Sequence, residues 1–144
     1  MFVATLGGVG RLRPAPGTWG SAVVLPLVFL GPGICLVLAA VLTAAGYWAA
    51  RQVATDPRED PSWFVADEGV GMLIALAALP AVSWLGVALA FSLFRLLDIA
   101  KPWPVSWADR QAGALGIMMD DVLAGGIAAG LLLALGWFAP EVLR

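Results

Sequence analysis

Histidine is absent from this 144-residue sequence, and cysteine occurs once. Without imidazole the chain has neither His metal ligands nor His general bases, so acid–base or metal chemistry must fall to Asp and Glu. The single cysteine, Cys35, lies in an apolar run and has no partner for an internal disulfide, so we interpret it as a small core residue. No cleavable signal peptide is expected, because Arg11 and Arg13 follow the first apolar residues instead of preceding them.

Charge is also scarce. Only 12% of the residues are charged and 61% are hydrophobic, with a mean hydropathy of +0.92. A soluble domain usually carries about 25% charged residues, so this chain has too little polar surface to cover a water-soluble globule. We therefore predict an integral membrane protein with a single domain, residues 1–144. The net charge of -2 says little about partners, and no basic patch in the sequence indicates a nucleic-acid partner.

Three long stretches contain no charge: residues 22–50, 69–94 and 122–140. The first two are too long for one span of about 20 residues and too short for two complete spans. As single spans they would place Asp67 and Glu68 across the membrane from Lys101. Turn signals at Gly31-Pro32-Gly33 and Pro80-Ala81 instead favour helical hairpins.

With hairpins, most cations share one side, as is typical of a cytoplasmic face. That side would carry Arg11, Arg13, Arg51, Arg58, Arg95, Lys101 and Arg110, and the other only Arg144. We expect an all-α, polytopic membrane helical bundle with short hairpins and a polar site at the cytoplasmic membrane edge. A helix from Trp63 would carry Asp67 and Glu68 in its second turn. A helix from Gly116 would carry Asp120 and Asp121 in its first turns.

Carboxylates are concentrated between the apolar runs. Asp67, Glu68, Asp98, Asp120 and Asp121 would meet at one level, where bare acids repel one another and lose hydration. A hard divalent cation relieves both problems, and an oxygen-only ligand set favours Mg²⁺. The alternative is that the charges form structural ion pairs. That explains Arg95 with Asp98, three residues apart, but leaves the other acids in excess.

Residues 17–21 read Gly-Thr-Trp-Gly-Ser after two prolines. Thr18 or Ser21 is a candidate cap for the following helix, in a simple close-packed turn. Alternatively, the segment is a loop whose backbone N–H groups face an anion at a helix N-terminus.

Four ordered motifs resemble the phosphatidylglycerophosphatase A family nearly end to end: PGTWGS at residues 16–21, VADEGVG at 65–71, FRLLDIAKPWP at 94–104 and GIMMDDVLAG at 116–125. Gly69 departs from the family, where a bulkier residue is common. The resemblance implies an all-helical, Mg²⁺-dependent enzyme of the bacterial inner membrane. Such an enzyme removes the terminal phosphate of phosphatidylglycerophosphate to leave phosphatidylglycerol.

The same resemblance suggests roles for individual side chains. Four would hold one or two Mg²⁺ ions: Asp67, Glu68, Asp120 and Asp121. Asp98 and Lys101 would also take part in catalysis, and Arg95, Lys101, Thr18 and Ser21 would bind the phosphate. Asp60 and Asp109 would either bind the metal themselves or lie outside the ligands and orient them. The nucleophile would be water, or the carboxylate of Asp98 or Asp120 in an aspartyl-phosphate mechanism.

A divalent-cation transport subunit and a purely structural membrane subunit are alternative functions. Transport requires charges distributed through the membrane depth along a path. The interiors of all three apolar stretches are uncharged, which argues against conduction.

Overall fold

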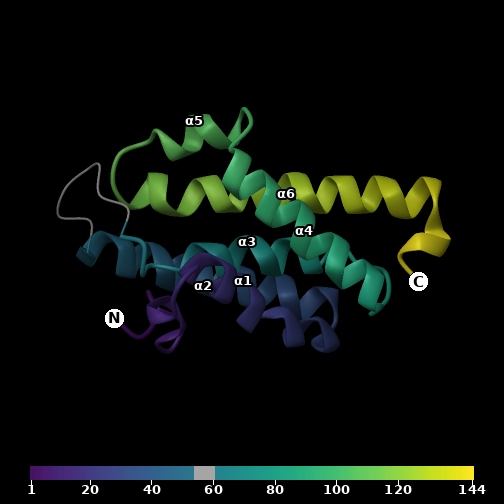
Figure 1. Ribbon diagram of the computed structural model, residues 1–144, viewed down its shortest axis with the longest axis horizontal. Helices are drawn as coiled ribbons and strands as arrows, with labels where there is room; N and C mark the ends of the chain where they lie inside the picture. The colour runs from purple at the N-terminus through teal and green to yellow at the C-terminus, as the bar shows by residue number, and fades with distance from the viewer. Residues whose placement is uncertain (54–60) are drawn as a thin grey trace.

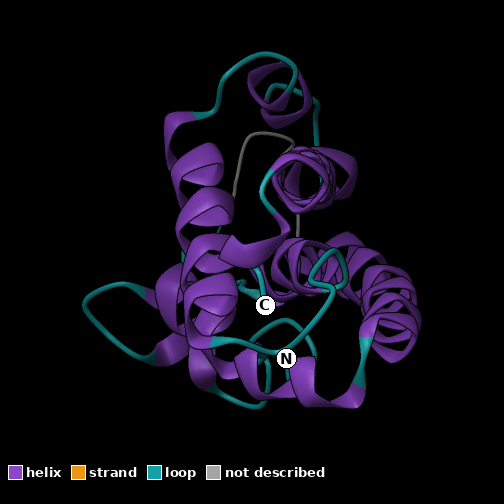
Figure 2. Cartoon of the chain, turned by 90° about the vertical axis from the view of Figure 1, so that its right-hand side faces the viewer, coloured by secondary structure: helices purple, strands orange, loops and turns teal. Residues whose placement is uncertain are grey.

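The computed structural model describes residues 1–53 and 61–144, and its regular structure there is entirely helical (Figures 1 and 2). The all-α prediction is confirmed for this part of the chain, whereas Arg58 and Asp60 lie outside the described residues. Within these two ranges, six α-helices and three short 3₁₀ helices follow one another in the order η1 (Val9–Arg11), α1 (Pro16–Val23), η2 (Leu25–Leu30), α2 (Pro32–Val53), α3 (Ala66–Leu76), α4 (Trp84–Ala100), α5 (Val105–Asp109), α6 (Ala114–Phe138) and η3 (Pro140–Val142).

Both predicted turns are present. The chain reverses between η2 and α2 at Gly31, whose φ of 88° is a backbone conformation that glycine adopts without strain. It reverses again between α3 and α4, where Ser83 caps α4 by accepting a hydrogen bond from the Gly86 N–H at 3.1 Å. Both turns and the C-terminus lie at one end of the molecule (Figure 1). The N-terminus, α5 and the start of α6 therefore share the opposite end.

Helix boundaries differ from the predicted ones by two or three residues. Helix α3 begins at Ala66, so Asp67 and Glu68 stand in its first turn and not in its second. Helix α6 begins at Ala114, two residues earlier than predicted, so Asp120 and Asp121 lie about two turns from its start. Since one turn is only 3.6 residues, the acids stay near the same end of both helices.

Two helices, α2 with 22 residues and α6 with 25, are long and apolar enough to cross a membrane. Large apolar side chains project outward from both, including Val37 and Trp48 on α2 and Leu133, Trp137 and Phe138 on α6. Exposed apolar side chains on helices of this length are consistent with contact with lipid.

Helix α3 is the centre of the bundle, and it contacts α1, α2, α4 and α6. It meets α6 through glycine on both sides. A Cβ atom on Gly125 would lie 2.7 Å from the Gly71 Cα, and one on Gly71 would lie 2.6 Å from the Asp121 carbonyl oxygen. The buried Phe94 ring of α4 closes the same junction. Small residues let helix backbones touch in this way. The contact sets the lengthwise register of α3 against α6.

Substituting Gly125 with Ala should lower the free energy of unfolding by about 1–3 kcal/mol, because the added methyl group overlaps the α3 backbone. Gly126→Ala on the same helix is the matched control, since a Cβ there meets nothing within 4 Å. Alanine is the better helix former, so this control should be neutral or slightly stabilising. Thermal unfolding in detergent measures both. Equal stability of the two variants would contradict a backbone contact at Gly125.

Candidate active site

Five carboxylates from three helices converge at one end of the bundle. The first turn of α3 carries Asp67 and Glu68, the last turn of α4 carries Asp98, and α6 carries Asp120 and Asp121. Oxygen atoms of Asp67, Glu68 and Asp121 lie within 4.8 Å of one another, as do those of Asp98, Asp120 and Asp121. Because Asp121 belongs to both groups, the five side chains form one continuous carboxylate cluster.

The carboxylate cluster is largely removed from solvent. Relative exposure is 6% for Asp67, 5% for Asp120 and 3% for Asp121. Two buried oxygen atoms, Glu68 Oε2 and Asp121 Oδ1, accept no hydrogen bond. Burying a carboxylate oxygen without a partner is strongly unfavourable. A hard cation supplies the missing interaction, and carboxylate oxygens are the ligands that Mg²⁺ prefers, so the residues present fit this ion.

Each adjacent acidic pair is oriented by its own backbone. The Glu68 N–H donates to Asp67 Oδ1 and the Asp121 N–H donates to Asp120 Oδ1, both at 3.0 Å. In α3 this bond also holds Asp67 in the first helical turn, where free N–H groups favour negative charge. Local helix geometry therefore positions part of the carboxylate cluster before any cation is considered.

Two cations border the cluster. Arg95 Nη1 donates to Asp98 one turn further along α4, and Lys101 Nζ donates to Asp120 Oδ2 at 2.8 Å and also to Asp109 of α5. Burial would lower the pKa of Lys101, but the hydrogen bonds to Asp109 and Asp120 outweigh that effect and raise it above its ordinary value. Lys101 is therefore a permanent cation. Ion pairing accounts for Asp98, Asp109 and Asp120, and it leaves Glu68 and Asp121 without an explanation.

The backbone at the end of α4 places Lys101. Its φ of 45° and ψ of 54° are left-handed, and Pro102 follows directly. A left-handed residue ends a helix, and proline prevents its continuation. The chain then turns into α5, which brings Asp109 alongside the lysine. Asp109 thus holds Lys101 and is not part of the carboxylate cluster.

The structure corrects the interpretation of residues 17–21. They belong to helix α1, whose N-cap is Ala15 and whose first residue is Pro16, so neither Thr18 nor Ser21 is a cap and the segment is not a loop. Ser21 is fully buried, and its hydroxyl donates to the Gly17 carbonyl at 2.9 Å. Thr18 lies in the first turn of α1 and is half-buried.

Gly17 lies against Glu68, a contact that the interpretation of residues 17–21 as a loop did not include. A Cβ atom there would collide with Glu68 Oε1 and would lie 3.3 Å from Arg95 Nη1. Helix α1 therefore contacts the carboxylate cluster at Gly17, where a larger residue would displace the Glu68 side chain. The available signal was a glycine directly after Pro16, in a first helical turn where glycine is not needed for conformation.

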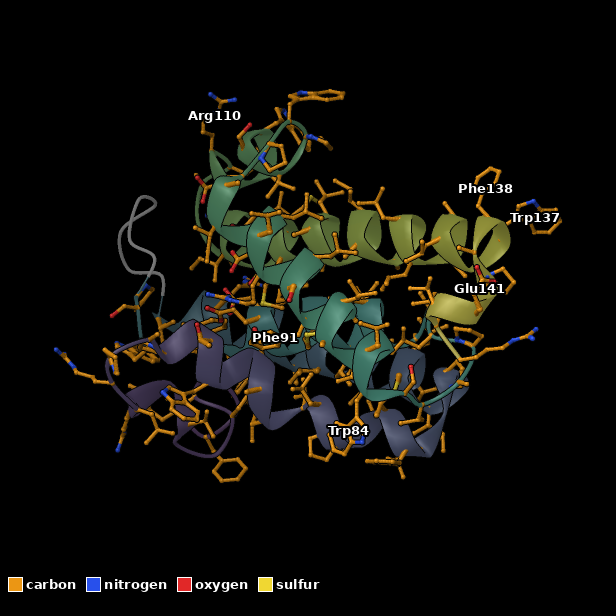
Figure 3. All side chains as sticks on the ribbon, turned by 45° about the vertical axis from the view of Figure 1, so that its right-hand side comes forward. Trp84, Phe91, Arg110, Trp137, Phe138 and Glu141 are labelled. Atoms are coloured by element: carbon orange, nitrogen blue, oxygen red, sulfur yellow. The ribbon has the colours of Figure 1, made fainter. Side chains whose placement is uncertain are left out.

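The carboxylate cluster and the far end of α6 lie apart along the molecule. In Figure 3, Arg110 projects from the end that carries α5, whereas Trp137 and Phe138 project from the far end of α6. The carboxylate cluster belongs to the end of Arg110, since it lies at the starts of α3 and α6. The fold and the site thus define a class: an apolar helical protein with an acid-rich, cation-bordered centre at one end, which suits phosphate chemistry.

The sequence model of the phosphatidylglycerophosphatase A family matches residues 2–136, and the chain belongs to this family. It is thus an enzyme, a lipid phosphomonoesterase, which confirms the resemblance stated from its motifs. Family membership gives no support to the alternatives of a transport or structural subunit.

Individual relatives agree with the family assignment. The chain is 39% identical to phosphatidylglycerophosphatase A of Escherichia coli, over 92% of this chain and 81% of that protein. It is 41% identical to the Haemophilus influenzae protein of the same name, over 81% of this chain and 76% of that protein. It is also 41% identical to a putative phosphatidylinositol-3-phosphatase of Bacteroides thetaiotaomicron, over 87% of this chain and 86% of that protein. No solved structure matches the chain.

Substituting Gly17 with Ala should lower phosphate release from a lipid phosphomonoester by about 10–100-fold, because the methyl group displaces the Glu68 carboxylate. Gly33→Ala is the matched control, since a Cβ on Gly33 meets nothing within 4 Å. Thermal unfolding should show both variants folded. Full activity of Gly17→Ala would mean that the position of Glu68 does not matter for turnover.

Proposed function

We propose that this chain hydrolyses the terminal phosphomonoester of phosphatidylglycerophosphate to phosphatidylglycerol and phosphate, in a Mg²⁺-dependent reaction. The observation that carries the proposal is the buried carboxylate cluster, with two unpartnered oxygens, beside Arg95 and Lys101. The names of two relatives support the substrate. The third relative is named as a putative phosphatidylinositol-3-phosphatase, so the feature that the three names share is a lipid that carries phosphate.

Four carboxylates would hold the metal: Asp67, Glu68, Asp120 and Asp121. Bound there, Mg²⁺ would neutralise the charge that gathers on the phosphoryl oxygens during transfer. The donor set supports this assignment, because it contains oxygen alone and more acid than neighbouring base.

Arg95 and Lys101 would bind the phosphate. A lysine ammonium has three N–H donors, and Asp109 and Asp120 take two of those on Lys101, so a third remains for a phosphate oxygen. Arg95 donates to Asp98 through Nη1, while its buried Nε has no partner. Its guanidinium therefore keeps donors for a second phosphate oxygen. These two contacts would orient the phosphorus toward the carboxylate cluster.

Hydrolysis forms a bond from a water oxygen to phosphorus and breaks the bond from phosphorus to the lipid oxygen, which leaves as an alcohol after gaining a proton. With no histidine in the chain, a carboxylate must accept the proton of the attacking water. Asp98 is suited to this, since it reaches the carboxylate cluster and is held by Arg95. We propose water as the attacking nucleophile in preference to the carboxylate of Asp98 or Asp120.

We place the protein in the bacterial inner membrane as a multi-pass protein, with its site at the cytoplasmic edge. Two long apolar helices and the bacterial relatives support this location. The cationic segments and the carboxylate cluster share one end, and that asymmetry is typical of a cytoplasmic face. A site at this depth receives the head group of a lipid whose acyl chains stay in the leaflet.

Purified protein should release phosphate from phosphatidylglycerophosphate in Mg²⁺ and lose that activity in a chelator. Asp121→Asn keeps the shape of the side chain but removes the charge, so activity should fall by more than about 100-fold while the protein stays folded. Phosphate release and thermal unfolding measure the two effects. Activity in the chelator would rule out the metal requirement, and an active Asp121→Asn would rule Asp121 out as an essential ligand.

Topology can be tested with single cysteines in a Cys35→Ala background. Arg144→Cys should react with a membrane-impermeant maleimide from outside spheroplasts, whereas Arg110→Cys should react only after permeabilisation, because these residues belong to opposite ends of the bundle. Mass shift on a gel reports the labelling. Labelling of both cysteines from one side, or the reverse pattern, would refute the orientation.

A further inference from the structure

An apolar groove of about 460 Å³ lies between the N-terminal segment, α1, η2 and α2. None of its lining residues has a polar side chain, and they include Phe2, Leu6, Val23, Leu42, Ala45 and Leu73. The volume is within the range of small-molecule sites, about 300–1,000 Å³. Such a hollow accepts an apolar chain and offers no hydrogen bond to a polar ligand.

The groove adjoins the catalytic helices. Gly69 follows Glu68, and a Cβ on Gly69 would lie 2.9 Å from Leu6 Cδ1 and 3.2 Å from Leu42 Cδ2, both in the groove wall. Helix α1 touches Glu68 at Gly17 and reaches the groove at Val23. Six residues of helix separate these two positions, or about 9 Å. The head group and glycerol of one phospholipid can cover that distance.

The N-terminal segment forms one wall of the groove. The Val65 N–H donates to the Ala4 carbonyl at 2.8 Å, which ties the segment to the start of α3. Thr5 Oγ1 donates to the Met1 carbonyl and accepts from the Gly8 N–H, both at 3.0 Å. These bonds hold Phe2 and Leu6 as a wall over α2 and α3.

Charge beside the groove indicates which kind of molecule it binds. A second hollow, of about 360 Å³, lies along the same N-terminal segment and is lined in part by Arg11, Arg13 and Pro16. Among residues 1–53 and 61–144, neither arginine forms an ion pair. Pro16 and Val23 are seven residues apart and so share a face of α1. A cationic hollow and an apolar groove along one helix complement an anionic phospholipid.

We infer that the groove binds one acyl chain of the lipid substrate and so aligns its phosphate with the carboxylate cluster. The identity of that lipid rests on the proposed function. The acyl chain would extend along α2 from Leu42 and Ala45 toward η2, while the head group stays at the Gly17 end of α1.

Filling the groove tests the inference. Ala45 lines it, whereas Ala44 is exposed outside it, so Ala45→Phe and Ala44→Phe add the same side chain to the same helix at different places. We expect Ala45→Phe to lower kcat/KM about tenfold for dipalmitoyl phosphatidylglycerophosphate relative to the dibutyryl lipid, and Ala44→Phe to leave that ratio unchanged. Loss of activity on both lipids alike, or no change in the ratio, would overturn the acyl-chain site.

A second measurement does not depend on turnover. Wild-type protein is irradiated with phosphatidylglycerophosphate that carries a diazirine in one acyl chain, and labelled peptides are identified by mass spectrometry. Labelling of groove residues on α1 and α2 that decreases when unlabelled lipid is added supports the site. Labelling that unlabelled lipid does not reduce shows contact with bulk lipid only and refutes the site. If labelling is displaced but wild type releases no phosphate, the proposed function fails and the groove stands. If phosphate is released without a chain-length effect, the groove fails and the function stands.

Discussion

Glycine on both sides of one helix crossing decides where the acids of this protein meet. At Gly71 and Gly125, α3 and α6 contact each other through backbone atoms, which no larger residue permits. Glu68 and Asp121 each lie about one turn before the crossing, so the contact brings them face to face. A longer separation between the helices would leave the carboxylates too far apart to share an ion. The active site therefore depends on the closest packing in the bundle.

That packing creates an electrostatic problem which the rest of the site addresses in part. Five carboxylates lie together, and only Arg95 and Lys101 neutralise them within the described residues. The start of α3 favours the negative charge of Asp67 and Glu68, and backbone N–H groups bind Asp67 and Asp120, but Glu68 and Asp121 keep buried oxygens without partners. An arrangement so unfavourable for the isolated protein is typical of a site built for a ligand. A divalent cation and a phosphate together complete its charge balance.

The same bundle also positions a lipid. Its long helices α2 and α6 expose apolar side chains, and the carboxylate cluster lies at one end of the molecule, so the polar and apolar zones follow the two parts of a phospholipid. Helix α1 connects the zones, since Gly17 contacts Glu68 and Val23 lines the apolar groove. Recognition of the head group and of an acyl chain can therefore be coupled through a single short helix.

Composition and spacing by themselves determined the helical class, the turns at Gly31 and before α4, and the acids that would gather, because these follow from hydropathy, proline and glycine positions, and excess charge. The family came from the resemblance of four sequence motifs. Only the tertiary structure decided that Asp121 joins the two carboxylate groups, that Asp109 serves Lys101, and that Gly17 belongs to the site. Thr18 and Ser21 were misread as capping or loop residues because Pro16 starts a helix earlier than their side chains suggest. The physical reason is that local patterns specify helices and their ends, whereas contacts between residues far apart in the chain depend on how closely those helices pack.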